Sequence, residues 1–206
     1  MKLSEYIGSQ FGNPTGIFGK ICCVIMNIIN RKLYAGVSES IILKSDSKVL
    51  DIGYGNGHLI KMIYGKNKCS IYGIDISEDM MVSASKRNNN GITAGKIHLT
   101  IGNCCELQYE DAFFDAVTSV NTIYFWEDTF KGLSEIYRVL KAGGTFSNAI
   151  YSKQWMQKTP YTKKGFKLFE PYEIEALAKK AGFTMVEIKE IRHGDCYIIN
   201  CKKYML

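Results

Sequence analysis

The sequence predicts an α/β protein of three layers, in which helices cover both faces of a seven-stranded, mostly parallel sheet that ends in an antiparallel hairpin. Short apolar stretches alternate with amphipathic stretches from about residue 48 onward, which is typical of strands and helices in turn. The last two apolar stretches flank the turn Arg192–Asp195, which is a hairpin pattern. A glycine-rich turn directly follows the first strand, where such folds bind ligands.

The first half of the sheet pattern contains three strands and two helices. The strands are expected at 49–52, 69–74 and 97–101, and the helices at 57–64 and 78–88. Ser77 is placed to cap the second helix through its hydroxyl group. Asn88 to Gly91 are turn residues, so we expect them to stop that helix.

The second half continues the alternation and then changes to the hairpin. Strands are expected at 116–120, 145–151, 183–191 and 196–204, and helices at 129–140 and 171–181. Gly143 and Gly144 end the first of these helices, whereas the second has Pro171 in its first turn and Gly182 after its end. Both features are typical of helix boundaries.

Length and composition favour one domain. The chain has 206 residues, of which 46% are hydrophobic, so it can bury one sizeable core. We expect an N-terminal helical segment at 1–45 and a core at 46–206. No apolar run is long enough to span a bilayer and the N-terminus lacks a secretion-signal pattern, so we expect a cytoplasmic protein.

Cysteine usage gives no metal pattern. The seven cysteines show no C-x-x-C spacing, and we interpret them as reduced thiols that pack as small apolar side chains. A zinc site built from Cys104, Cys105 and His98 is disfavoured because adjacent cysteines rarely point at one metal ion. We therefore expect no metal.

The formal net charge of +6 raises the question of nucleic-acid binding. The basic residues are scattered, and the densest groups, at 163–167 and 202–203, are short and do not show the interleaved aromatic pattern of an RNA-recognition sheet. A small-molecule partner is therefore favoured over a nucleic acid.

The turn after the first strand has the composition of a nucleotide-cofactor site. Gly53, Gly55 and Gly57 alternate with other residues, and backbone N–H groups can approach a ligand closely where side chains are absent. Asp75 follows the second strand, at the position where an acidic side chain can hydrogen-bond a ribose.

The spacing of the glycines distinguishes between cofactors. A dinucleotide fingerprint reads G-x-G-x-x-G, but here the spacing is G-x-G-x-G and His58 stands where the last glycine would be. Asp51 precedes the turn, and its carboxylate would repel a pyrophosphate but suits a ligand with an ammonium group and no phosphate. S-adenosylmethionine is such a ligand.

Several segments resemble the class I S-adenosylmethionine-dependent methyltransferases, of the small-molecule, methyltransferase domain 11-like type. The matching segments, in chain order, are Val49–Leu59, Tyr72–Ser77, Ile101–Leu107, Phe114–Trp126 and Arg138–Phe146. In the third segment Asn103 replaces the family's aspartate, which keeps a hydrogen-bond acceptor but removes the charge. The resemblance covers the chain from about Lys48 to the C-terminus and implies a Rossmann-like fold.

The resemblance also implies which residues contact the cofactor. Asp51 and the backbone of Gly53, Tyr54, Gly55, Asn56 and Gly57 would hold the methionine part, and Asp75 the ribose hydroxyls. Ile76 and Met80 would flank the adenine, Asn103 and Cys104 would meet its amino edge, and the backbone of Asn121 would border the sulfonium. Ordinary core packing is an almost equally good interpretation of Ile76, Met80 and Cys104.

The N-terminal segment contains a glycine- and proline-bearing loop, Phe11–Gly16, and an apolar helix candidate, Ile17–Asn30. A membrane-surface helix would need a more cationic polar face than this one offers. A dimer helix is an alternative, but we favour a lid over the ligands. In that arrangement Tyr6 and Phe11 could contact the substrate, although simple packing is the commoner role of such aromatic residues.

The sequence indicates fewer of the residues that would contact the methyl acceptor. Asn121–Trp126 departs from the Asn/Asp-Pro-Pro-Tyr/Phe signature of methyltransferases that modify base amines or glutamine amides. Tyr124 and Trp126 could line an apolar pocket, or one of them could pack beneath the loop. Tyr151, Trp155 and Tyr161, in or near the loop after the fifth strand, are further candidates. The catalytic residue is unknown: His58, His193 and Tyr124 are weak candidates, and each histidine is better interpreted as structural.

These observations predict an S-adenosylmethionine-dependent methyltransferase, with S-adenosylhomocysteine as product, that acts on an oxygen, nitrogen or carbon atom of a small molecule. Two alternatives remain from the sequence: a nicotinamide-dependent oxidoreductase, and a non-catalytic module that binds S-adenosylmethionine. An RNA or protein acceptor is less favoured. The oligomeric state is not readable from the sequence.

Overall fold

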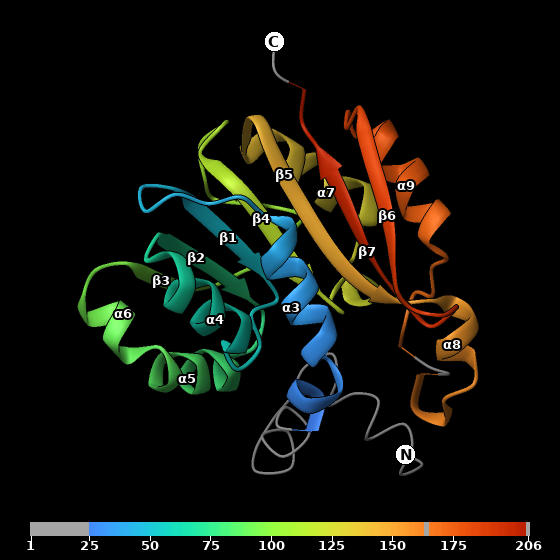
Figure 1. The fold of residues 1–206 in the computed structure, drawn as a ribbon, viewed down its shortest axis with the longest axis horizontal. Coiled ribbons are helices and arrows are strands. Elements are labelled where there is room, and N and C mark those ends of the chain that lie inside the picture. Colours follow the sequence, from blue (N-terminus) through green and yellow to red (C-terminus); the bar gives the residue numbers. More distant parts are fainter. Residues whose placement is uncertain (1–24, 163–164, 205–206) are drawn as a thin grey trace.

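One sheet of seven strands organises the residues described in a computed structural model of the chain, 25–162 and 165–204 (Figure 1). The strands are β1 Lys48–Ile52, β2 Ser70–Asp75, β3 Ile97–Ile101, β4 Phe114–Val120, β5 Leu140–Tyr151, β6 Met185–Arg192 and β7 Cys196–Lys202. Their order is β3-β2-β1-β4-β5-β7-β6. Pairings from β3 to β5 are parallel, whereas β7 runs antiparallel to both β5 and β6, so the predicted fold class is confirmed.

Helices cover both faces of this sheet (Figure 1). The α-helices with assigned bounds are α3 Arg31–Ser40, α4 His58–Asn67, α5 Glu78–Arg87, α6 Asn89–Thr93, α7 Thr129–Val139, α8 Lys153–Gln157 and α9 Pro171–Lys180. Two 3₁₀ turns, η1 Ile123–Phe125 and η2 Pro160–Thr162, follow β4 and α8. In Figure 1, α3 and α4 cross in front of the sheet and α7 lies behind it. The central strands are therefore buried on both faces, and almost every residue of β1 and β4 is buried.

Helix α3 lies within the segment expected to precede the core, yet it packs on β4, β5 and β7. Leu33 and Val37 on its inner side are fully buried. Gly36 lets the helix approach the sheet, because a Cβ atom there would lie 2.2 Å from the Cδ1 atom of Ile198. The division at residues 45 and 46 stays a prediction, but this helix forms part of the sheet's covering layer.

Several element boundaries differ from the expected ones. Helix α5 ends at Arg87, one residue before the expected end, and residues 89–93 form the short helix α6 rather than a simple turn. The buried Asn88 side chain joins the two helices to the glycine turn by donating to the carbonyl oxygens of Gly57 and Ala84. Strand β5 begins at Leu140, before the two glycines that were expected to end the preceding helix, and its pairing with β4 shifts register at that point.

The expected helix caps are confirmed. The Ser77 hydroxyl accepts a hydrogen bond from the Met80 N–H group at the start of α5. Helix α9 begins at Pro171 with a capping box between Glu170 and Glu173, and Gly182 follows its end. These local signals fixed the helix starts correctly because they depend only on residues within one turn.

Among the described residues, no helix has the length and apolar character needed to cross a membrane. Cys69, Cys104, Cys105, Cys196 and Cys201 are buried and free of disulfide bonds. Within the same ranges, no group of three His, Cys, Asp or Glu side chains is positioned to hold a metal ion.

Candidate active site

The turn between β1 and α4 forms the floor of the candidate site. Gly53, Gly55 and Gly57 all have left-handed backbone conformations, with φ of 69°, 50° and 71°. The Gly53 N–H group donates to the carbonyl oxygen of Ile74 at 2.7 Å, which ties the turn to the end of β2. A Cβ atom on Gly53 would lie 2.3 Å from the Thr122 methyl group, so the turn passes directly against the residues that follow β4.

Asp75, the last residue of β2, holds this turn through its carboxylate. One oxygen accepts from the Gly55 N–H group at 2.8 Å and the other from the Ser77 N–H group at 3.0 Å. Burial raises the pKa of Asp75, and these backbone hydrogen bonds oppose the increase. The side chain thus connects the glycine turn to the start of α5 and still has lone pairs for further donors.

Asp51 in β1 is the other buried carboxylate of the site. Its exposed fraction is 2%, and it accepts a hydrogen bond of 2.8 Å from the Thr118 hydroxyl on β4. Burial raises its pKa to about 7; the Thr118 hydrogen bond lowers it, and the charge of Asp75 raises it further. Near neutral pH this carboxyl group therefore titrates, and a nearby cation would favour its ionised form.

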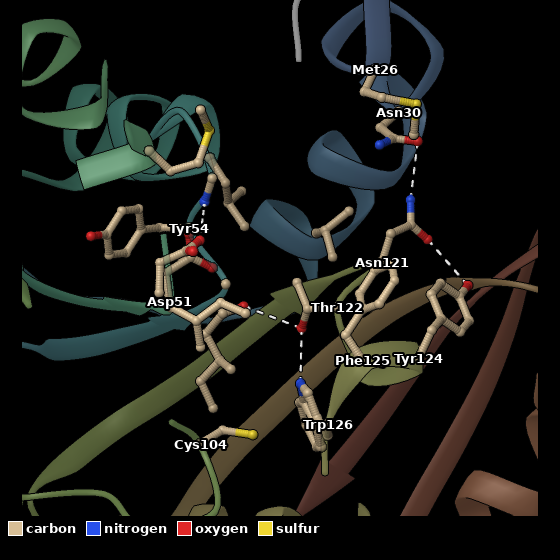
Figure 2. Close-up of a pocket in the computed structure, with 18 of the residues that line it drawn as sticks. Met26, Asn30, Asp51, Tyr54, Cys104, Asn121, Thr122, Tyr124, Phe125 and Trp126 are labelled. Atoms are coloured by element: carbon tan, nitrogen blue, oxygen red, sulfur yellow. Dashed lines mark hydrogen bonds between the residues drawn. The ribbon is translucent and has the colours of Figure 1, made fainter. Parts of the chain in front are cut away.

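These elements surround a cavity of about 370 Å³ at the carboxyl ends of the parallel strands (Figure 2). Its described lining contains three acidic side chains, Asp51, Asp75 and Glu127, and no lysine, arginine or histidine. In Figure 2, Asp51 and Tyr54 lie on one side and Asn30, Asn121 and Tyr124 on the other. The cavity therefore has an acidic end at β1 and β2 and a second end beyond β4.

Most residues expected to contact the cofactor line this cavity. They are Asp51, Gly53, Tyr54, Gly55, Asn56, Asp75, Ile76, Met80, Asn103, Cys104 and Asn121. Met80 is buried, whereas Ile76 is 56% exposed. Gly57 is not part of the lining: it is the N-cap residue of α4, and a Cβ atom there would meet Asn88 and Ala84. The Asn103 side-chain oxygen accepts from the Cys105 N–H group at 2.9 Å, so this side chain also shapes its own loop.

Most of the aromatic residues named for the acceptor line the cavity. Tyr124, Trp126, Tyr151 and Trp155 all line it. Tyr124 is buried, and its hydroxyl lies 3.0 Å from the Tyr151 carbonyl oxygen and 2.6 Å from the Tyr151 nitrogen. Trp126 is 5% exposed, and its indole N–H donates to the Thr122 hydroxyl at 3.1 Å. Burial raises the pKa of Tyr124 well above 10, so its hydroxyl is held as a structural donor and acceptor rather than a base.

The two histidine candidates do not line the cavity. His58 begins α4 and packs against Tyr34, with ring centroids 5.1 Å apart. Burial and the nearby charges of Arg87 and Lys61 lower its pKa. His193 lies in the β6–β7 turn with a fully exposed side chain. Tyr6 and Phe11 lie outside the described residues, as does the side chain of Tyr161.

The structure adds lining residues that the sequence did not indicate. They include Met26, Asn30, Thr122, Phe125, Met156 and Phe166. Thr122 and Phe125 stand inside the fourth-strand segment already identified, so its position was a usable signal. Asn30 ends the apolar helix candidate that was expected to lie over the ligands, although Asn30 itself was not named, whereas Phe166 lies in a lysine-rich segment that does not suggest a ligand.

Comparison with known proteins agrees with this geometry. A family profile described as a methyltransferase domain matches residues 50–147. The uncharacterized methyltransferase YdaC of Bacillus subtilis is 30% identical over 166 residues, which cover 80% of this chain and 87% of that protein. The ubiquinone/menaquinone biosynthesis C-methyltransferase UbiE of a Geobacter species is 28% identical over 214 residues, covering 93% of this chain and 91% of that protein.

A solved structure supports the fold. Phosphoethanolamine N-methyltransferase 2 of Haemonchus contortus, in complex with S-adenosyl-L-methionine, superposes with a TM-score of 0.71 and 20% identity. The match covers 85% of this chain and 53% of that one. Given the glycine turn, the two buried carboxylates and the extent of the match to YdaC, the chain belongs to the class I S-adenosylmethionine-dependent methyltransferases.

Proposed function

We propose that this enzyme transfers the methyl group of S-adenosylmethionine to a small-molecule acceptor, an activity of the EC 2.1.1 class. The observation that carries the proposal is the charge of the cavity: Asp51 and Asp75 are buried in it, and its described lining contains no cationic side chain. A phosphate-bearing dinucleotide would meet carboxylates without any compensating cation. A ligand with an ammonium and a sulfonium group fits this environment, which disfavours a nicotinamide cofactor.

The lining residues support an assignment for each part of the cofactor. Asp51 and the glycine turn would hold the methionine part, and Asp75 would bind the ribose hydroxyls. Met80 and Ile76 would enclose the adenine, with Asn103 and Cys104 at its edge. Asn121 follows β4 with a left-handed φ of 59° and lines the cavity. It would then border the reactive end of the cofactor.

When bound, the sulfonium supplies a methyl group that is already electrophilic. The protein's own contribution is to align the acceptor and to exclude water. Tyr124, Phe125 and Trp126 line the cavity, and the rings of Tyr124 and Phe125 lie near that of Phe166. Lys167 fixes the backbone at the end of this segment, because its ammonium group donates to the carbonyl oxygens of Trp126 and Glu127 at 2.8 and 2.6 Å. The described lining offers no histidine for proton removal.

A small-molecule acceptor is supported by the names of the relatives. UbiE is named as a C-methyltransferase of quinone biosynthesis and aligns with 93% of this chain. The acceptor end of the cavity is lined by aromatic side chains and, among the described residues, by no basic ones, which suits a small molecule better than a nucleic acid.

Isothermal titration with S-adenosylmethionine, S-adenosylhomocysteine and NADH tests the proposal. The first two ligands should bind in the micromolar range and NADH should not. The proposal would be abandoned if S-adenosylhomocysteine produced no heat at high micromolar concentration. Incubation with a radiolabelled methyl donor and a mixture of candidate acceptors then separates an active enzyme from a module that only binds the cofactor.

A further inference from the structure

Four polar side chains form a hydrogen-bonded cluster at the acceptor end of the cavity (Figure 2). The side-chain oxygen of Asn30 accepts from the Asn121 amide at 3.1 Å and from the Tyr151 hydroxyl at 3.1 Å. The Asn121 oxygen in turn faces the Tyr124 hydroxyl at 3.3 Å. The cluster joins the N-terminal helical region to the residue after β4 and to the end of β5.

Asn30 is the member whose hydrogen-bonding capacity is incompletely used. Its residue is 3% exposed and it lines the cavity. Two donors occupy its oxygen, so the amide is oriented with its NH₂ group turned away from Asn121 (Figure 2). That NH₂ group has no hydrogen-bond partner among the described residues, although a buried amide normally uses its donors. The Asn30 amide thus offers the cavity an oriented N–H group that can donate a hydrogen bond to a ligand oxygen.

The surrounding walls are apolar and include flat aromatic surfaces. The Tyr151 and Trp155 rings are stacked, with centroids 4.2 Å apart and planes inclined by 22°. Phe125 and Phe166 form a second aromatic pair, with centroids 4.7 Å apart. Side chains of this kind favour a planar apolar ligand, because they gain contact area with little loss of side-chain entropy.

The charges at this end exclude two other classes of ligand. The described lining has no cationic side chain to pair with a carboxylate or phosphate, so an anionic acceptor would lose its hydration without compensation. Asp51 lies at the opposite end of the cavity (Figure 2), Asp75 accepts from the Gly55 N–H group of the glycine turn, and Glu127 is exposed, so an ammonium group would have no buried partner beside Asn30. An uncharged acceptor fits best.

We propose that the acceptor is an uncharged planar ring compound and that Asn30 binds its carbonyl or hydroxyl oxygen through the free amide N–H. Asn30 is then a specificity-determining residue: Asn121 and Tyr151 fix its orientation, and the aromatic walls hold the ring. This inference rests on the proposed methyltransferase function, since it assigns the other end of the same cavity to the methyl donor.

Four naphthalene compounds provide matched probes. 2-Naphthol carries a neutral oxygen, 2-naphthoate an anionic group, 2-naphthylmethylammonium a cationic group, and naphthalene no polar group. Each is titrated calorimetrically at pH 8 into the full-length protein saturated with S-adenosylhomocysteine. We expect 2-naphthol to bind about tenfold more tightly than the other three, because only it can use the Asn30 donor without burying an unpaired charge.

Two substitutions then test the residue. Asn30→Asp keeps an oxygen for Asn121 and Tyr151 but removes the donor, and Asn30→Leu removes the whole amide. Each should weaken 2-naphthol binding by roughly tenfold while the affinity for S-adenosylhomocysteine stays within about twofold. Asn90→Asp, an exposed position on α6, is the matched control for the added charge and should change neither affinity.

The outcomes separate the two proposals. If the wild-type protein does not bind S-adenosylhomocysteine, the proposed function itself is refuted. If the cofactor product binds normally, the inference is overturned by any of three results: no binding of 2-naphthol at 1 mM, tighter binding of the charged probes, or unchanged 2-naphthol affinity in both Asn30 variants. A 2-naphthol preference that both variants lose would support it.

Discussion

The Thr118 hydroxyl donates a hydrogen bond of 2.8 Å to the Asp51 carboxylate, across the pairing of β4 with β1. This bond stabilises the charged form of a carboxyl group whose burial favours the neutral form. The balance leaves the pKa of Asp51 at about 7, at the end of the cavity assigned to the methionine part of the cofactor.

Cofactor affinity should therefore depend on pH. The ammonium and sulfonium groups attract ionised Asp51, so protonation below its pKa of about 7 weakens binding. Between pH 8 and pH 6 we expect the affinity for S-adenosylmethionine to fall by up to about tenfold. Calorimetry at both pH values measures this. The Asp51→Asn variant should bind more weakly and show a shallower pH dependence, which an equally steep profile would contradict.

Thr118 should set the midpoint of that profile. The Thr118→Val substitution removes the hydrogen bond that lowers the pKa of Asp51 and leaves a side chain of nearly the same shape. The pKa should then rise, and the loss of affinity should begin at a higher pH. An unchanged midpoint in the same titration would mean that the hydrogen bond does not control this ionisation.

Protein stability should show the opposite pH trend at this residue. The pKa of Asp51 is about 7 in the folded protein and 3.8 as the ordinary value, so between these values the folded state binds a proton that the unfolded chain has released. The contribution of Asp51 to the free energy of unfolding thus rises as pH falls from 7, and it is least favourable above 7. Urea unfolding at pH 5.5 and pH 8 should show that Asp51→Asn loses this gain; a parallel change in both proteins would argue against it.

Asp75→Ala should weaken cofactor binding more than any change to a surface carboxylate. The substitution removes the acceptors for the Gly55 and Ser77 N–H groups as well as the proposed ribose contacts. We expect a loss of affinity of roughly tenfold to a hundredfold for S-adenosylhomocysteine, as for hydrogen bonds to a charged group. Asp46→Ala, at an exposed loop position, is the control. Equal affinities for the two variants would show that the ribose assignment is wrong.

Gly53→Ala should disrupt the glycine turn. Its φ of 69° disfavours a side chain, and the new Cβ atom would lie 2.3 Å from the Thr122 methyl group. Gly95→Ala is the matched control, because Gly95 also has a left-handed φ of 65° but its Cβ position is open. The control should lose about 1–2 kcal/mol of unfolding free energy from backbone strain. Gly53→Ala should lose more and should also bind cofactor poorly; a smaller loss than the control would contradict the close contact.

Two helical glycines should respond to alanine with opposite signs. In α3, Gly36→Ala would press a Cβ atom against Ile198, and overpacking of this kind costs about 1–3 kcal/mol. In α4, a Cβ atom on Gly65 meets no neighbouring atom, so Gly65→Ala should stabilise the helix by about 0.5–1 kcal/mol. Chemical denaturation measures both. A stabilised Gly36 variant would mean that α3 lies further from the sheet.

The cofactor end of the site was largely predictable from the sequence. Its residues lie at the ends of successive strands, and Asp51, Gly53 and Asp75 belong to short local patterns. The acceptor end was only partly predictable. Tyr124 and Tyr151 were named for their position after strands, but their hydroxyl and backbone bonds to one another depend on the pairing of β4 with β5.

The sequence by itself determined the order of strands and helices, the helix caps and the glycine turn, because periodicity, capping and backbone conformation act over a few neighbouring residues. Only the tertiary structure decided which side chains meet at the acceptor end. Asn30 joins Asn121 and Tyr151 across 91 and 121 positions of the chain. No local pattern encodes such a meeting, because it arises when α3 packs against the sheet and brings the preceding residue over the end of β4.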